Sequence, residues 1–362
     1  MPINPEIAYN ELPLLPPEQQ HLETIPILKQ ESKAAVALAE LKGLAKTLPN
    51  QSILINALVL KEARASSEVE NIITTHDKLY EAITAKSITP DLATKEVLRY
   101  REALIYGFEE ISQKGFLNTN GICRIQAILE ENEAGIRKLP GTALKNDRTG
   151  VTVYTPPDDQ AVIRKLMKNL EEYINLLDES TSPLIRLAVQ HYQFESIHPF
   201  YDGNGRTGRI INMLFLILHG LLDSPVLYLS GFIINNKGEY YRLLQKVRTE
   251  TAWQEWLSFM LRGMEETART TIDQINEINT ALQETIETVK NKAQKIYLKE
   301  LIELLFEHPY SKIEFLEDRG IAKRKAAGRY LHELESLGIL ELKKIGKENI
   351  FINKRLWSIL ER

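Results

Sequence analysis

The sequence predicts a mainly α-helical protein with one β-hairpin in its middle and a small separate unit at its end. Apolar residues recur every three or four positions along most of the 362 residues, which is the period of an amphipathic helix. Residues 135–157 instead carry a turn at residues 146–150 flanked by alternating side chains, as a hairpin does. Residues 296–362 indicate three helices followed by two short strands. Because two strands alone are marginally stable, the isolated hairpin suggests a functional role.

Composition describes an ordinary globular protein. Apolar residues make up 43% and charged residues 26%, and the net charge of −4 gives no overall signature of nucleic-acid or membrane binding. The single cysteine, Cys123, cannot form an internal disulfide, so we expect an inert core residue in a reducing, cytoplasmic setting. The first residues lack a secretory pattern, and apolar stretches such as 210–218 are too short to span a bilayer.

The elements before the hairpin follow from breakers and apolar spacing. Six prolines within residues 1–30 predict an extended arm on the surface, and Pro49-Asn50 ends the first helix. The helices expected before the hairpin span residues 32–48, 52–66, 76–85, 92–114 and 118–131.

Behind the hairpin, the chain returns to helical spacing. We expect a loop at residues 231–237, where glycine and asparagine flank a short apolar run. The helices expected here span residues 158–177, 183–194, 210–218, 253–265 and 270–289, with a further helical stretch around 239–244.

Residues 198–209 concentrate the chemistry of the chain. Gly203 and Gly205 let a loop backbone approach a ligand closely, and the unpaired N–H groups that open the following apolar helix suit a phosphate. Arg206 and Arg209 are three residues apart, so their guanidinium groups leave the first turn on one face and can grip successive phosphates. A glycine-rich interhelical turn with surface arginines is the alternative, and the combination at this spacing argues against it.

Two further side chains in this stretch complete a site for phosphate chemistry. Asp202 beside so much positive charge suggests a Mg²⁺ ion that bridges the carboxylate to phosphate oxygens. His198 titrates near neutral pH and suits a general base. Residues 203–208 also match the dinucleotide pattern G-x-G-x-x-G, but that pattern needs a preceding strand, and a helix precedes it here. A Walker-type loop is absent from the sequence.

Residues 198–209 read H-P-F-Y-D-G-N-G-R-T-G-R, which resembles the signature of Fic-domain proteins at every specified position. The resemblance implies transfer of AMP from ATP to a target hydroxyl, with His198 as the base and Asp202 as the Mg²⁺ ligand. It also implies that Arg206 holds the β-phosphate, Arg209 holds the γ-phosphate and Phe200 anchors the loop. The ATP-binding residues implied within the stretch are Gly203, Asn204, Gly205, Arg206, Thr207, Gly208 and Arg209.

Residues 66–71, S-S-E-V-E-N, follow the helix predicted over 52–66. Taken alone, they could be a helix end and a turn. They also resemble the inhibitory motif [S/T]-x-x-x-E-[G/N] of Fic proteins, with Ser66, Glu70 and Asn71 in the matching places. The resemblance implies that Glu70 pairs with Arg209 and thereby occupies the guanidinium meant for the γ-phosphate.

The hairpin and a tyrosine pair also resemble the family. The hairpin corresponds to a flap that pairs with the target backbone as an added strand, for which the implied docking residues are Thr142, Ala143, Leu144 and Lys145. Tyr240 and Tyr241 match a pair that lines the adenine pocket, although two core tyrosines on a helix remain an alternative. Some members carry an asparagine seven residues after the pair, and here that position is Arg248.

The tail, residues 296–362, resembles a winged helix-turn-helix. Its third helix opens with Lys323, Arg324 and Lys325, and its turn carries further lysines, so it could bind DNA or, alternatively, a protein. The amphipathic helix before it could link domains or pair with a copy of itself in a homodimer. The expected domains are residues 1–115 (N-terminal helical region with the inhibitory motif), 116–265 (Fic core), 266–295 (linker helix) and 296–362 (winged helix-turn-helix).

Three hypotheses of function follow from these patterns. The first is a self-inhibited protein adenylyltransferase that uses ATP and Mg²⁺ and acts on a serine, threonine or tyrosine of a target protein. The second is a DNA-binding regulator whose Fic core senses nucleotide. The third reverses the enzyme, so that Glu70 positions a water molecule and the same site removes AMP.

Overall fold

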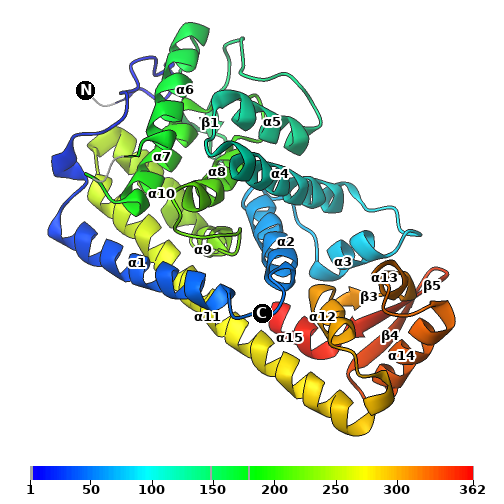
Figure 1. The fold of residues 1–362 in the computed structure, drawn as a ribbon. Coiled ribbons are helices and arrows are strands. Elements are labelled where there is room, and N and C mark those ends of the chain that lie inside the picture. Colours follow the sequence, from blue (N-terminus) through cyan, green and yellow to red (C-terminus); the bar gives the residue numbers. More distant parts are fainter. Residues whose placement is uncertain (1–2, 147–148, 178–179, 362) are drawn as a thin grey trace.

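The computed structural model describes residues 3–146, 149–177 and 180–361, and it confirms the mainly helical fold with one small hairpin (Figure 1). Part of the predicted turn, residues 147–148, lies outside the described residues. The elements of the first half are α1 (Ile25–Ala45), α2 (Ser52–Val69), α3 (His76–Thr84), α4 (Leu92–Lys114), α5 (Thr119–Glu130), β1 (Leu144–Lys145), β2 (Thr152–Tyr154) and α6 (Gln160–Asn175).

The elements of the second half are α7 (Pro183–Ile197), α8 (Asn204–Leu218), α9 (Leu229–Asn235), α10 (Lys237–Glu250), α11 (Trp253–Lys292), α12 (Lys299–Glu307), β3 (Tyr310–Ser311), α13 (Ile313–Asp318), α14 (Arg324–Ser336), β4 (Leu340–Ile345), β5 (Glu348–Asn353) and α15 (Lys354–Leu360). Across the part of the chain that the structure describes, none of the helices combines the length and apolar character that a membrane crossing demands.

Helix α8 is the centre of the larger lobe. It packs against α2, α4, α5 and α7, and nearly all its side chains are buried, both the polar ones of its first turn and the apolar run of residues 210–216 (Figure 1). Helix α7 begins at Pro183, which supplies a helical φ in the first turn, and the side chain of the preceding N-cap residue, Ser182, accepts the Leu184 N–H. The 198–209 stretch therefore joins two buried helices, and the core fixes the loop between them.

Helices α1 and α11 lie side by side in parallel along one edge of the molecule, with Thr24 bonded to Gln254 near their starts and Thr47 bonded to Asn279 further along (Figure 1). The helix predicted over 253–265 and the linker predicted over 270–289 are one continuous helix of 40 residues, because the apolar spacing runs on without a breaker. The N-terminal arm lies on the lobe, with Leu12, Leu15 and Leu22 buried. The loop predicted at 231–237 was wrong: this segment lies in α9 and the start of α10, since Phe232 and Ile233 are buried against α2 and α11.

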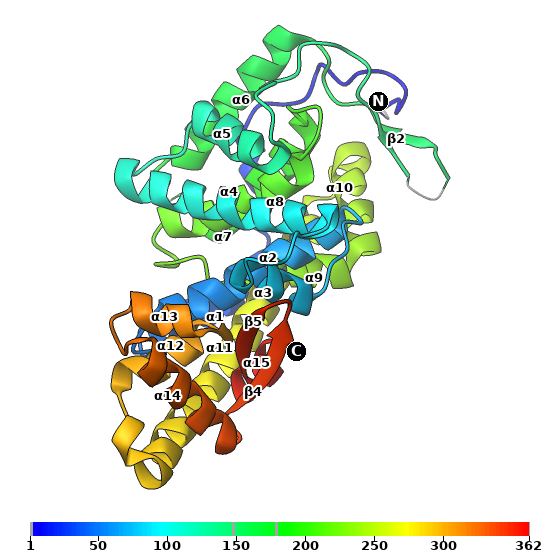
Figure 2. The same cartoon turned by 90° about the vertical axis from the view of Figure 1, so that its right-hand side faces the viewer.

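The C-terminal unit, residues 299–360, contains the expected three helices and two strands. The sequence missed β3 and α15. Strand β5 is the middle of an antiparallel sheet ordered β3-β5-β4, in which Leu340 pairs with Asn353 and Ile345 with Glu348. This unit lies against α3, the helix that follows residues 66–71 (Figure 2).

Aromatic rings and an ion pair hold the C-terminal unit on α3. Tyr80 stacks on Tyr310 with ring centroids 5.4 Å apart and meets Trp357 edge-on at 5.5 Å. Lys343 Nζ lies 2.8 Å from Glu81 Oε1. Buried aromatic pairs contribute about 0.5–1.5 kcal/mol each beyond their area. The unit is therefore docked on the helix that follows residues 66–71.

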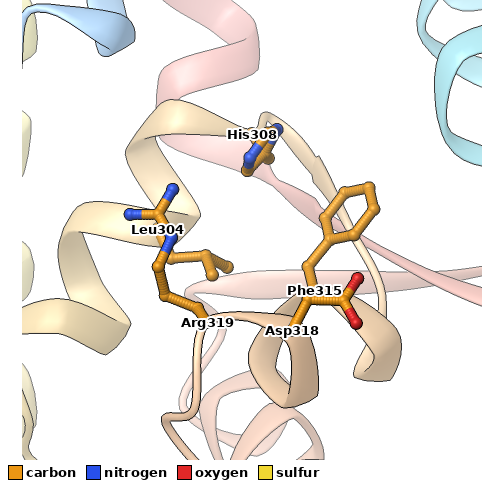
Figure 3. Close-up of a pocket in the computed structure, with 5 residues that line it drawn as sticks. All are labelled: Leu304, His308, Phe315, Asp318 and Arg319. Carbon is orange, nitrogen blue, oxygen red and sulfur yellow. The ribbon is translucent and has the colours of Figure 1, made fainter.

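A hollow of about 230 Å³ opens in the C-terminal unit between α12 and α13 (Figure 3). Its walls are Leu304, His308, Phe315, Asp318 and Arg319. Arg319 already donates to Glu307 at 2.6 Å. None of the lining residues belongs to the 198–209 stretch, and the hollow is not part of the candidate active site.

Candidate active site

His198 ends α7 in the left-handed region, with φ of 48° and ψ of 60°. Non-glycine residues rarely adopt this conformation, and such strain persists only where surrounding contacts impose it. The conformation turns the chain from the buried helix into the loop and leaves His198 partly exposed. Among the described residues, the buried Nδ1 of His198 has no hydrogen-bond partner.

The loop that follows is closed by its own asparagine. The Asn204 side chain accepts the Phe200 N–H at 2.9 Å and donates to the Phe200 carbonyl at 2.9 Å, while the Phe200 ring is fully buried. The Asn204 side chain is thus engaged in fixing the loop, and a nucleotide would meet its backbone. Asp202 is exposed at the loop, and its Oδ1 accepts the Gly203 N–H at 2.7 Å.

The first turn of α8 forms an anion-binding end that a carboxylate from α2 approaches. Gly203 takes a φ of 76°, which glycine adopts without strain, and the helix begins at Asn204. A Cβ added to Gly205 would overlap Glu70 Oε1, so the carboxylate lies directly against the Gly205 backbone. A negative group at this position is stabilised by the free N–H groups and the partial positive charge of the helix end.

The predicted pair of Glu70 and Arg209 lies within one hydrogen-bonded cluster. Arg209 is 3% exposed and donates from Nη2 to Glu70 Oε1 at 2.8 Å. Its Nε donates to Ser66 Oγ at 2.7 Å, and its Nη2 also donates to the Ser66 carbonyl at 2.8 Å. The guanidinium expected to hold a γ-phosphate is therefore occupied by α2.

A helix-ending motif aims Glu70 at this arginine. Helix α2 ends at Val69, and Asn71 takes a φ of 63°. The Ile72 N–H bonds the Ser67 carbonyl and the Asn71 N–H bonds the Glu68 carbonyl, which together form a Schellman motif. The left-handed residue of that motif is glycine or asparagine in most helices, which explains the residue type at position 71. Lys237 also donates to Asn71 Oδ1 at 3.1 Å.

Arg206 has partners that the sequence did not predict. Its Nη2 donates to Glu130 Oε1 at 2.7 Å and its Nη1 donates to Glu96 Oε2 at 3.3 Å. The arginine is 4% exposed, and burial raises the pKa of Glu130, with further contributions from Asp202 and Glu96. Glu96 and Glu130 come from α4 and α5, so only the tertiary fold brings them to the motif.

Other residues that the family resemblance assigns to nucleotide binding lie deeper in the core than the loop does. The Thr207 side chain is fully buried, and a Cβ on Gly208 would stand 2.7 Å from Glu195 Oε1. A nucleotide would therefore contact neither the Thr207 side chain nor the Cα of Gly208. Tyr240 is buried and its hydroxyl lies 2.9 Å from His191 Nε2. Tyr241 is 44% exposed beside it, with ring centroids 5.1 Å apart. Only the second tyrosine of the pair therefore offers an open face.

The flap has a short ladder and a firm base. Leu144 pairs with Tyr154 and Lys145 with Thr152, with an irregularity between them, while Thr142 and Ala143 lie before the strand. At the base, the buried Arg137 donates from Nε to the His198 carbonyl at 2.9 Å. The hairpin is thus fastened to the 198–209 stretch.

Three side chains that contact the candidate site received no role in the sequence analysis: Arg137, Glu195 and Arg248. Arg248 lies 4.0 Å above the Tyr154 ring and donates to Ser196 Oγ at 3.2 Å. Glu195 is buried, and burial raises its pKa to about 7, although Arg209 opposes the shift. The sequence offered two signals for such roles: Glu195 lies three residues before the 198–209 stretch, and Arg248 stands where some family members carry asparagine.

Two histidines in this region are held neutral. Burial lowers the pKa of His198 to about 3, and the charges of Arg137 and Arg248 act in the same direction. Burial and Arg209 lower the pKa of His191 to about 3 as well. A neutral His198 can accept a proton at pH 7, which a general base requires.

His191 gives a pH prediction for stability. The unfolded histidine takes up a proton below about pH 6.5, while the folded one stays neutral down to its lowered pKa, so stability falls as pH falls. Between pH 7.5 and pH 5, His191 should reduce the free energy of unfolding by about 2 kcal/mol. Urea unfolding at both pH values checks this: His191→Gln should weaken the dependence, whereas the exposed His332→Gln should not. An undiminished dependence in His191→Gln would contradict it.

The positions of the carboxylate side chains indicate what kind of metal site the described residues could form. Within residues 3–146, 149–177 and 180–361, no three His, Cys, Asp or Glu side chains gather as a metal cage. Mg²⁺ is commonly bound through one or two carboxylates and substrate phosphates. Asp202, exposed beside the free N–H groups of α8, fits that donor set.

Three family models match the chain in succession. Residues 28–109 match the Fic/DOC family N-terminal model, residues 116–216 match the Fic/DOC family model, and residues 281–356 match the C-terminal domain of SoFic-like protein adenylyltransferases. Among curated relatives, protein adenylyltransferase fic-1 of Caenorhabditis elegans is 35% identical over 94 residues, which cover 25% of this chain and 17% of that protein. Protein adenylyltransferase Fic of Drosophila melanogaster is 28% identical over 130 residues, which cover 36% of this chain and 25% of that protein.

Solved structures share the fold at low identity. A Fic family protein from Desulfovibrio desulfuricans G20 aligns with a TM-score of 0.59 and 18% identity, covering 91% of this chain and 96% of that chain. Fic-1 from C. elegans aligns with a TM-score of 0.54 and 20% identity, covering 69% and 74%. The matched segments span a quarter or less of the two curated relatives, but the three family models lie in order along this chain. The chain therefore belongs to the Fic/DOC family, with a Fic N-terminal region before the Fic domain and a SoFic-like C-terminal domain behind it.

Proposed function

We propose that this protein is a protein adenylyltransferase that transfers AMP from ATP to a hydroxyl of a target protein, and that Glu70 restrains it. One observation carries the proposal. Glu70 lies against the Gly205 backbone and within 2.8 Å of Arg209, in the anion-binding end of the helix that follows His198. A carboxylate at a helix end that suits phosphate accounts both for a nucleotide site and for its inhibition by Glu70.

The reaction follows from the placement of these groups. When Glu70 leaves, Arg209 and the first N–H groups of α8 bind the end of the triphosphate. The neutral His198 accepts the proton of the target hydroxyl, whose oxygen forms a bond to the α-phosphorus while the bond to the β-phosphate oxygen breaks. Pyrophosphate leaves with that electron pair, and no covalent enzyme intermediate forms. Catalysis is then chiefly positioning and charge stabilisation.

Asp202 would hold the Mg²⁺ that accompanies ATP, and the ion would neutralise phosphate charge. Arg206 would have to leave its ion pairs with Glu96 and Glu130 before it could hold the β-phosphate. The adenine would lie toward Tyr241, whose ring is the exposed one of the pair.

Labelled nucleotides test the proposal. With Glu70→Gly, label from [α-³²P]ATP should be retained on protein, whereas label from [γ-³²P]ATP should not, because only AMP is transferred. Retention of the γ-label would identify a kinase and contradict the proposal. Loss of AMP from a previously labelled protein upon addition of wild-type enzyme would instead support the reverse reaction. Labelled proteins recovered from the host lysate would identify the target.

We infer duplex DNA as a second partner, through α14. Lys325, Arg329 and His332 are exposed at positions i, i+4 and i+7, so they form one stripe along the helix. Lys323 and Arg324 extend the positive charge at its start, and both are exposed. An exposed basic stripe on a helix suits the major groove and its phosphates.

Fluorescence anisotropy with a duplex of about 20 base pairs tests this partner, since binding dominated by phosphates weakens steeply with salt. Arg329→Gln should lower the affinity and reduce the slope of log K against log salt by about one unit. Lys299→Gln on the exposed side of α12 is the matched control. An absence of binding at 50 mM salt would favour a protein partner for this face.

A further inference from the structure

The end of α7 is bonded by side chains that come from outside the helix. A helix leaves its last carbonyl groups without partners of its own. Here the Phe194 carbonyl accepts the His198 N–H at 2.9 Å, and the next five carbonyls, residues 195–199, remain to be satisfied. The elements that supply the partners are the base of the flap and α10.

Arg137 accounts for three of these five carbonyls. Its Nε donates to the His198 carbonyl at 2.9 Å, its Nη2 donates to the Ile197 carbonyl at 3.4 Å, and its backbone N–H donates to the Pro199 carbonyl at 2.9 Å. The same Nη2 donates to the Pro157 carbonyl, at the exit of the flap. Arg137 is 1% exposed, so these bonds are shielded from water.

The remaining two carbonyls are bonded from the other flap strand and from α10. The Tyr154 hydroxyl, on β2, donates to the Ser196 carbonyl at 2.9 Å. Arg248, on α10, donates to the Glu195 carbonyl at 3.5 Å and lies over the Tyr154 ring. In Figure 2 the hairpin projects from the lobe, and the hydrogen bonds of Arg137 and Tyr154 join its base to the buried end of α7.

We propose that Arg137 is a positioning residue that joins the flap to His198, so that a strand docked on the flap and the catalytic base belong to one hydrogen-bonded unit. This inference rests on the proposed adenylyl transfer. The left-handed backbone of His198 is then held from outside the helix, by the element that orients the target. The chain couples the position of the acceptor hydroxyl to the position of the base that deprotonates it.

Electrostatics support the same link. Arg137 and Arg248 are the charged side chains that lower the pKa of His198 alongside burial. Glu195, on the same helix, faces Gly208 and Arg209, and Asp202 is exposed on the loop. Removing the charge of Arg137 should therefore raise the pKa of His198, whereas a lysine at this position should keep it low.

The test uses the full chain with Glu70→Gly, self-labelling from [α-³²P]ATP, and a pH series. Arg137→Gln should lower the rate constant at saturating ATP by about 100-fold, since misplacing a catalytic group by about 1 Å has that effect. The ATP concentration at half-maximal rate should stay within about threefold. Arg137→Lys should lose about tenfold, because an ammonium cannot reproduce the fork of a guanidinium. In Arg137→Gln alone, the acidic limb of the pH–rate profile should move to higher pH. The control Arg164→Gln, at an exposed arginine, should leave the rate constant and the pH profile unchanged.

A measurement without activity separates this inference from the proposed function. In protein labelled with ¹⁵N-histidine, the pKa of His198 should rise in Arg137→Gln and stay unchanged in Arg137→Lys. If Glu70→Gly labels itself but Arg137→Gln matches it in rate and pH profile, the link is overturned and the transferase stands. If no variant transfers label while the His198 pKa still rises, the proposed reaction fails and the connection between Arg137 and His198 survives. If Arg137→Gln fails to fold, Arg137→Lys and Tyr154→Phe decide through their rate constants, and wild-type rates in both would overturn the proposal.

Discussion

Replacing Glu70 with glycine should raise AMP transfer by about 100-fold or more. In the wild-type structure, Glu70 neutralises Arg209 at 2.8 Å and lies where the phosphates would meet the first turn of α8. Gaining one preorganised charged donor in such a site changes the rate by about 10²–10³. Self-labelling with [α-³²P]ATP, followed over time for both proteins, measures the effect.

Glu68→Gly is the matched control for this substitution. Glu68 lies two residues earlier, near the same helix end, and its carboxylate is 3.8 Å from Arg64. Glycine at position 68 costs helix propensity in the last turn of α2 without changing a contact of Arg209. We expect Glu68→Gly to label as weakly as the wild type. Equal labelling by both variants would mean that a loosened α2, and not a freed guanidinium, is responsible.

ATP should also stabilise Glu70→Gly more than it stabilises the wild type. A ligand that binds only the folded state raises Tm by mass action, and the γ-phosphate would replace the lost carboxylate partner of Arg209. Differential scanning fluorimetry with ATP and Mg²⁺ gives this comparison independently of chemistry. An identical ATP-induced shift in Tm for both proteins would argue against competition between Glu70 and phosphate.

The sequence predicts much of this arrangement because its signals are local. The glycines at the start of α8, the proline that opens α7 and the asparagine that follows Glu70 each reflect a backbone requirement within a few residues. The ion pair between Glu70 and Arg209 spans 139 residues of sequence, and only the family resemblance suggested it. The contacts of Arg206 with Glu96 and Glu130 had no such pattern behind them, because they depend on how α4 and α5 pack on α8.

Tertiary burial accounts for the errors. Residues 231–235 look like a loop because glycine and asparagine bracket them, but Ser230 donates its N–H to the buried Glu62 at 3.0 Å and anchors the start of α9. Tyr240 and Tyr241 are adjacent in sequence, yet the helix directs one into the core and leaves the other exposed. Strand β3 has two residues, too few for any periodic signal, and it forms only against β5.

His198→Ala should lower AMP transfer by about 10²–10⁴-fold in the Glu70→Gly protein, since a positioned general base contributes about that much. In the proposed reaction the base acts on the target hydroxyl and not on the triphosphate, so the affinity for ATP should stay within about threefold. Single-turnover labelling gives the rate, and titration with a fluorescent ATP analogue gives the affinity. Equal loss of both would place His198 among the phosphate-binding residues instead.

The pH profile distinguishes this base from an ordinary surface histidine. Burial, Arg137 and Arg248 lower the pKa of His198 to about 3, so the imidazole is already neutral between pH 6.5 and 8. We expect the His198-dependent part of the rate to vary less than about twofold over that range, whereas a base with a pKa near 6.5 would lose half its activity at its lower end. A fall with the midpoint of an exposed histidine would mean that the site opens His198 to solvent before reaction. Arg137 and Arg248 would then lower the pKa of His198 only while the site is closed to solvent.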